Sequence, residues 1–78
     1  MAAACRATWA RSRPDVLTVT GNGMRPELAS VTPPAGVPTM DLLIGTGWHA
    51  VPGQRWREAE FSDGVWEIAV FRFPGETR

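Results

Sequence analysis

The feature that most constrains the fold of this chain is a hairpin pattern near its end. Residues 54–61 and 65–73 each have the composition of a β-strand. Ser62-Asp63-Gly64 between them suits a three-residue hairpin loop, with glycine at the position that needs a positive φ. A Pro-Gly pair ends the second strand. Residues 40–73 are therefore predicted to form an antiparallel meander of three or four strands.

Segments before this meander predict further strands. Residues 15–20 are rich in β-branched side chains, and the Gly-Asn-Gly turn after them predicts a hairpin. Its return strand is expected to be an edge strand or to begin after Pro26, because proline cannot donate a ladder hydrogen bond. A short helical turn over residues 25–29 is the alternative. Residues 33–38, PPAGVP, are predicted to form a loop.

The residues after this loop complete the expected fold. Residues 41–44 are predicted to form a buried strand and residues 48–51 another, with Gly-Thr-Gly between them as a bulge or turn, and Pro52-Gly53 turns the chain into the hairpin. The expected fold class is mainly β: a small antiparallel meander of about four to six short strands. It would form a partial barrel or a two-layer sandwich, with an irregular or short helical N-terminus.

The first 14 residues are predicted to differ from the rest. We expect residues 1–14 to be a flexible or helical segment and residues 15–78 to be one small β domain, best defined over residues 40–74. Alanines favour a helix at the start, and Pro14 would end it. An arginine-containing start with no acidic residue is also typical of a mitochondrial presequence, here with cleavage near residues 11–13. A frayed terminus and a docked helix are the other interpretations.

The charge balance argues against two classes of partner. Eight basic residues, all arginine, balance eight acidic ones, so the chain lacks the basic excess of proteins that bind nucleic acids or anionic membranes. No apolar run approaches the roughly 18 residues that a membrane span needs. One cysteine and one histidine cannot form an internal disulfide or a Cys/His zinc site. We therefore expect no nucleic-acid or membrane partner, no metal and no cofactor.

Both faces of the predicted hairpin are apolar. We expect Phe61 to lie opposite Val65 and Arg57 opposite Ala69, and alternation along the strands then sorts the side chains. One face carries Trp56, Trp66, Ile68 and Val70 with Glu58 and Glu60, and the other carries Phe61, Val65, Ala69, Phe71 and Phe73 with Arg55, Arg57 and Glu67. A solvent-exposed sheet face should be polar, so the N-terminal half of the chain or a partner must cover the second face.

The expected function follows from this second apolar face. We expect a non-enzymatic domain that acts through protein–protein interaction, as a subunit or accessory factor, with a protein partner or a second copy of the chain. Its candidate interface residues are Trp56, Trp66, Phe71 and Phe73. A cytoplasmic location is expected, with a mitochondrial one as the alternative. An organelle-imported subunit with a cleavable presequence, and a fragment or short reading frame with no stable independent function, are alternative interpretations.

A small set of polar residues supports an enzymatic or ligand-binding alternative. His49 is the one histidine of the chain, and Glu58 and Glu60 point to the same predicted face, where they could act with it. Cys5 lies in a segment where no base is positioned to activate it. No catalytic residue is therefore assigned, and His49, Glu58 and Glu60 are the candidate polar cluster.

Overall fold

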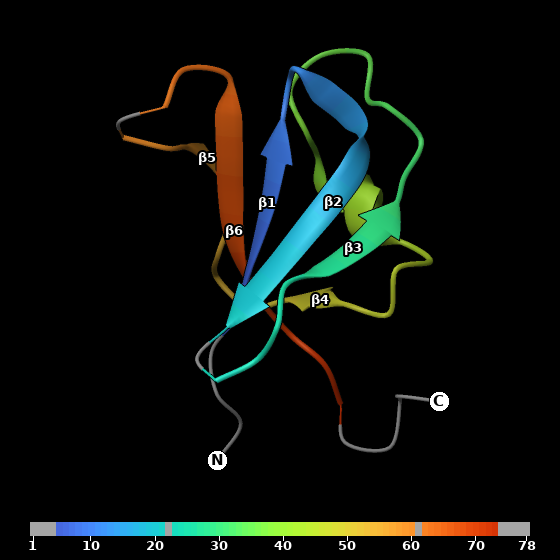
Figure 1. Cartoon of the computed structure of the whole chain (residues 1–78), viewed down its shortest axis with the longest axis vertical. Coiled ribbons are helices and arrows are strands. Elements are labelled where there is room, and N and C mark those ends of the chain that lie inside the picture. Colours follow the sequence, from blue (N-terminus) through green and yellow to red (C-terminus); the bar gives the residue numbers. More distant parts are fainter. Residues whose placement is uncertain (1–4, 22, 61, 74–78) are drawn as a thin grey trace.

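The computed structural model describes residues 5–21, 23–60 and 62–73, which form one curled antiparallel sheet (Figure 1). Its strands are β1 (Cys5–Ala10), β2 (Arg13–Gly21), β3 (Glu27–Ser30), β4 (His49–Ala50), β5 (Arg57–Glu58) and β6 (Val65–Phe71), with the 3-10 helix η1 (Met40–Leu43) between β3 and β4. The strand order is β3-β2-β1-β6-β4, and β5 also pairs with β6. The expectation of a mainly β, antiparallel fold is confirmed in the form of a half-barrel.

The N-terminal segment is a strand in the middle of this sheet. The expectation of a helical or flexible start is wrong for Cys5–Ala10, while residues 1–4 lie outside the described residues. Ala7 is fully buried between Val19 on β2 and Ile68 on β6. The helix preference of alanine, worth less than about 1 kcal/mol per residue, is outweighed by pairing and burial on both sides. Cleavage near residues 11–13, as in the presequence interpretation, would remove this central strand.

The β2–β3 hairpin agrees with the predicted return strand after Pro26. β3 begins at Glu27 and lies at the edge of the sheet, so the alternative of a helical turn over residues 25–29 is wrong. Gly23 has φ 76° in the turn, and Asn22 lies outside the described residues. The N–H of Val31 donates to the carbonyl of Asp15 at 3.0 Å and extends the pairing. Residues 33–38 form a loop, as predicted.

Residues 41–44 do not form the predicted strand. Met40–Leu43 is a 3-10 helix, in which the N–H of Leu42 donates to Thr39 O and the N–H of Ile44 to Asp41 O. The Thr46 hydroxyl then donates to the carbonyl of Leu43 at 2.7 Å. These local bonds satisfy the backbone that a strand would have paired with a neighbour, so an apolar run that suits a buried strand folds as a helical turn.

Strands β4 and β5 both pair with the same edge of β6, at separate positions along it. Seven positions separate Ala50 from Arg57, but only three separate their partners on β6, Val70 and Glu67, so four extra residues leave the ladder between them. The predicted Pro52-Gly53 turn is present, with the Gln54 N–H donating to Val51 O at 3.0 Å. This turn does not reverse the chain, because β4 and β5 run in the same direction along β6. Residues 51–56 connect the two strands, and we call this segment the detour. The predicted strands over residues 48–51 and 54–61 are each reduced to two residues.

The last hairpin is present with a register shifted by two residues. Arg57 lies opposite Glu67, where Ala69 was expected, and Phe61 lies outside the described residues. The shift arises because the Ala59 N–H donates to Val65 O at 2.7 Å, which leaves a loop over residues 60–64 in place of the expected three-residue one. A shift of two keeps Arg57 and Glu58 on their expected faces of the sheet.

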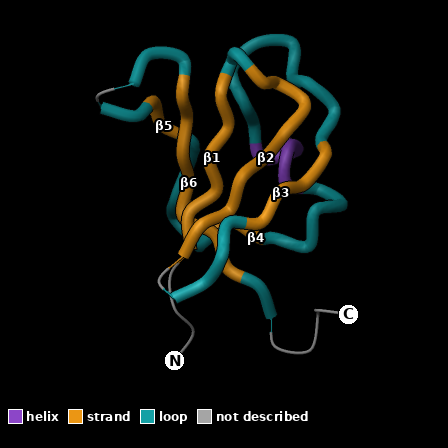
Figure 2. Tube along the Cα trace, viewed as in Figure 1, coloured by secondary structure: helices purple, strands orange, loops and turns teal. Residues whose placement is uncertain are grey.

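The core lies on the concave side of the sheet. Six strand residues and three residues from η1 and the following loop form a single buried cluster: Ala7, Trp9, Leu17, Val19, Ile68 and Val70 with Leu42, Leu43 and Trp48. The helix η1, purple in Figure 2, lies behind β2 and β3 in that view and contributes its two leucines to this cluster. One apolar face of the predicted hairpin is therefore covered by the chain itself.

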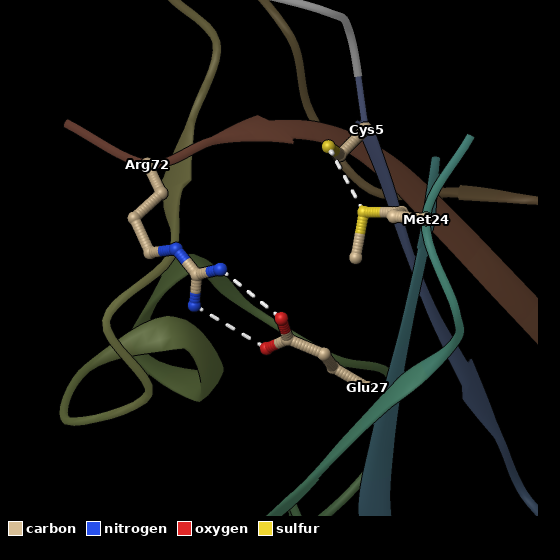
Figure 3. A network of polar contacts seen from close by, with 4 residues as sticks. All are labelled: Cys5, Met24, Glu27 and Arg72. Atoms are coloured by element: carbon tan, nitrogen blue, oxygen red, sulfur yellow. Dashed lines mark hydrogen bonds and ion pairs between the residues drawn. The ribbon is translucent and has the colours of Figure 1, made fainter. Parts of the chain in front are cut away.

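Polar and sulfur contacts hold the open end of the half-barrel (Figure 3). The Arg72 guanidinium forms a two-pronged ion pair with Glu27, at 3.3 and 3.0 Å, and lies 4.2 Å from the ring centre of Trp48. This contact links the edge strand β3 to the residue after β6. Nearby, Cys5 Sγ donates to Met24 Sδ at 3.8 Å, so the thiol packs against the β2–β3 turn.

Candidate functional site

A groove of about 620 Å³ lies beside η1. One continuous stretch, from Met40 to Gln54, supplies its lining, and none of the described lining residues is an aspartate, glutamate or arginine. Met40 and Ile44 stand at its rim, and Ile44 is 76% exposed. An open groove with an uncharged, largely apolar lining has the character of a binding site for apolar groups.

Two glycines shape this groove. Gly45 and Gly47 have φ values of 83° and 85°, which other L-residues rarely adopt, and no atom lies within 4 Å of a Cβ built on either. Thr46 between them accepts a hydrogen bond from the Trp48 N–H at 3.1 Å. The resulting tight turn buries Trp48 in the core while Ile44 points to solvent.

An aromatic cluster adjoins the groove at His49. The His49 ring centre lies 5.5 Å from that of Phe71 and 4.9 Å from that of Phe73, and the two phenylalanines meet edge to face at 4.9 Å. Phe73 is 52% exposed. Since His49 belongs both to the cluster and to the groove lining, the two features are continuous. We call the surface formed by Met40, Ile44, His49, Phe71 and Phe73 the groove surface.

The four predicted interface residues separate into two pairs. Phe71 and Phe73 belong to the groove surface, whereas Trp56 and Trp66 pack against the core cluster. Trp56 Nε1 donates to the Thr39 carbonyl at 3.0 Å and ties the detour between β4 and β5 to the residue before η1. Trp66 Nε1 is buried and has no hydrogen-bond partner among the described residues. Both tryptophans thus pack within the domain.

The predicted polar cluster is not assembled. His49 and Glu58 lie opposite Phe71 and Trp66, five positions apart on β6, which corresponds to about 16 Å along a strand. Glu58 accepts a hydrogen bond from the Gly64 N–H at 3.2 Å and so caps the hairpin loop, and Glu60 is exposed beside it. Within residues 5–21, 23–60 and 62–73, no three His, Cys, Asp or Glu side chains gather as a metal site would require.

Sequence reasoning missed the exposed members of the groove surface, Met40 and Ile44. The sequence signal for them is the group of large apolar residues directly before Gly45-Thr46-Gly47. From the sequence, that group is interpreted as a buried strand. Two of these residues, Leu42 and Leu43, are buried, and the flanking two, Met40 and Ile44, are exposed.

Fold and site together define a small β half-barrel that carries an apolar groove surface. Comparisons with protein-family models, with curated proteins and with solved structures found no match to this chain. Among the described residues, no helix has the length and hydropathy of a membrane span.

Proposed function

We propose that this protein is a non-enzymatic interaction domain and that its groove surface binds another protein chain. The observation that carries the proposal is the exposure of Ile44, 76%, in the lining of the apolar groove, together with Phe73, which is 52% exposed and packs against the groove residue His49. Large apolar side chains gathered around a hollow mark interaction sites, since leaving them in water costs free energy that a partner removes.

The shape of the groove surface favours a second copy of this chain as the partner. It holds a hollow and, beside it, a projecting side chain, Ile44. Under a two-fold axis, Ile44 of each protomer faces the groove of the other, which is the self-complementary arrangement of most dimers. No aspartate, glutamate or arginine lies among the described lining residues, so an inserted Ile44 would meet an uncharged groove.

Sedimentation equilibrium of the full chain tests this proposal. We expect the wild type to sediment as a dimer and Ile44→Asp as a folded monomer, because a carboxylate in the interface would be desolvated without a counter-charge. Leu28→Asp is the matched control, since Leu28 is 66% exposed on β3, at the opposite end of the strand order. A wild type that stays monomeric at millimolar concentration would reject the second copy as partner.

The groove volume favours one second candidate, the binding of an uncharged apolar small molecule. About 620 Å³ lies within the range of ligand pockets, and His49 supplies a polar group at the rim. The same Ile44→Asp variant separates the two functions in a titration with a neutral apolar fluorophore. If the dye competes with dimer formation, the groove can bind either a small molecule or a second copy of the chain. If the dye shows no saturable binding, the small-molecule function is rejected.

A further inference from the structure

A second hollow lies on the face of the sheet opposite the core, and arginines dominate it. Its volume is about 80 Å³, and its lining includes three arginines, one from β1, one from β5 and one from the detour before β5. The three are Arg6, Arg57 and Arg55, and Glu67 on β6 lines the same hollow.

The strand register explains why these side chains meet. Arg57 lies directly opposite Glu67 in the β5–β6 pair, and Arg6 lies opposite Ala69, two residues further along β6. Residues opposite each other, and residues two apart on one strand, point to the same face of a sheet. Arg6 and Arg57 therefore flank Glu67 from two neighbouring strands, and the detour after β4 brings Arg55 to the same hollow.

Glu67 neutralises only one of the three arginines. Its carboxylate pairs with Arg6 at 3.4 Å. Neither Arg55 nor Arg57 forms an ion pair or a side-chain hydrogen bond with any residue that the structure describes. Three positive charges and one negative charge leave an excess of two positive charges in the hollow, although the whole chain is neutral.

We propose that this hollow binds one phosphate-type oxyanion. A phosphate monoester carries about −1.5 to −2 charges at neutral pH, which matches the local excess, and its oxygens suit the planar fork of guanidinium donors. The hollow is small, about 80 Å³, and so suits a compact anion such as a single phosphate group. Gln54 also lines the hollow, and a glutamine side chain carries amide donors.

Nuclear magnetic resonance titration of the full chain with sodium phosphate tests this site. The backbone amides of Arg57 and Glu67 and the arginine Nε–H signals are followed, with sodium chloride at equal ionic strength as the reference. We expect saturable shifts with phosphate only. Arg57→Gln should weaken binding about ten-fold, the usual worth of a hydrogen bond to a charged group. Arg13→Gln is the matched control, because it removes the same charge from an exposed position outside the hollow and should leave the affinity unchanged.

A second variant and a second ligand complete the test. Glu67→Gln should strengthen phosphate binding, because it releases Arg6 and removes the one repulsive charge. An Ala-Ser-Ala peptide with a phosphorylated serine, compared with inorganic phosphate, distinguishes the sources: tighter binding of the peptide assigns the hollow to a phosphorylated protein, and equal binding assigns it to free phosphate. Shifts that chloride reproduces, or an affinity for phosphate that Arg57→Gln leaves unchanged, would overturn the proposal.

Discussion

At the scale of single residues, Trp9 ties the first two strands to the core. Its side chain is almost fully buried, and its Nε1 donates to the carbonyl of Pro14 at 3.0 Å, across the β1–β2 turn. On β1 it lies between Leu17 of β2 and Trp66 of β6. One side chain thus joins three strands and also satisfies its own polar atom.

Replacing this tryptophan should remove a large part of the stability. Truncation of a buried tryptophan to alanine costs about 3–5 kcal/mol, against a total of about 5–15 kcal/mol for a typical domain. We expect Trp9→Ala to lower the urea midpoint sharply or to unfold the chain. Val37→Ala, in the exposed loop before η1, should change it by less than about 0.5 kcal/mol. A loss below about 1 kcal/mol in Trp9→Ala would contradict this account of the core.

At the scale of secondary-structure elements, β1 is the strand on which the sheet depends. It pairs with β2 along one edge and with β6 along the other, so it joins the β2–β3 hairpin to the β4–β6 part. Removing its hydrogen bonds would separate the sheet into two parts, neither of which keeps the whole core.

A single proline substitution tests the central position of β1 in the sheet. Ala7→Pro removes a ladder donor from a strand that is paired on both sides, where proline is not tolerated, and it should abolish cooperative thermal unfolding followed by circular dichroism. Ala35→Pro, in the exposed loop over residues 31–39, is the control and should keep the wild-type transition. Equal transitions for the two variants would mean that β1 is not an integral strand.

The elements that could be predicted from sequence are those with local signals. Alternation and flanking turn residues identify β6, and Pro26 fixes the start of β3 at the sheet edge. The faces of the last hairpin were predicted correctly although its register was not, because a shift of two residues preserves alternation. Strand β1 was missed because its alanines favour a helix locally, and only its neighbours in the sheet make it a strand.

The candidate sites were less predictable than the elements. Phe71 and Phe73 were identified, but their joining to Ile44 depends on a 3-10 turn and a detour that the sequence pattern does not reveal. The arginine hollow depends on which strands flank β6 and on the exact register of β5. His49 and Glu58 were grouped because both were placed on neighbouring strands, but they pair with distant positions of β6.

At the scale of the whole molecule, the curl of the sheet decides which apolar surface stays accessible. The concave side is filled by η1 and Trp48, and the Arg72–Glu27 ion pair closes its open end. This pair is partly exposed, so it contributes modestly, about 0–1 kcal/mol, and the buried cluster provides most of the stability. Three of the five large apolar residues that stay exposed in the described chain, Met40, Ile44 and Phe73, belong to the groove surface, which directs the search for function to that side of the domain.

The most direct test of the central claim is photo-crosslinking from position 44 of the full chain, with benzoylphenylalanine in place of Ile44. The account predicts a product of twice the 8.5 kDa chain mass, in which the cross-linked peptide comes from the groove surface of the second protomer. The same probe at position 28, exposed on the edge strand β3, should give no such product. A probe at position 44 that yields only monomer, or no more dimer than position 28, would contradict the claim that the groove surface is an interface between copies of the chain.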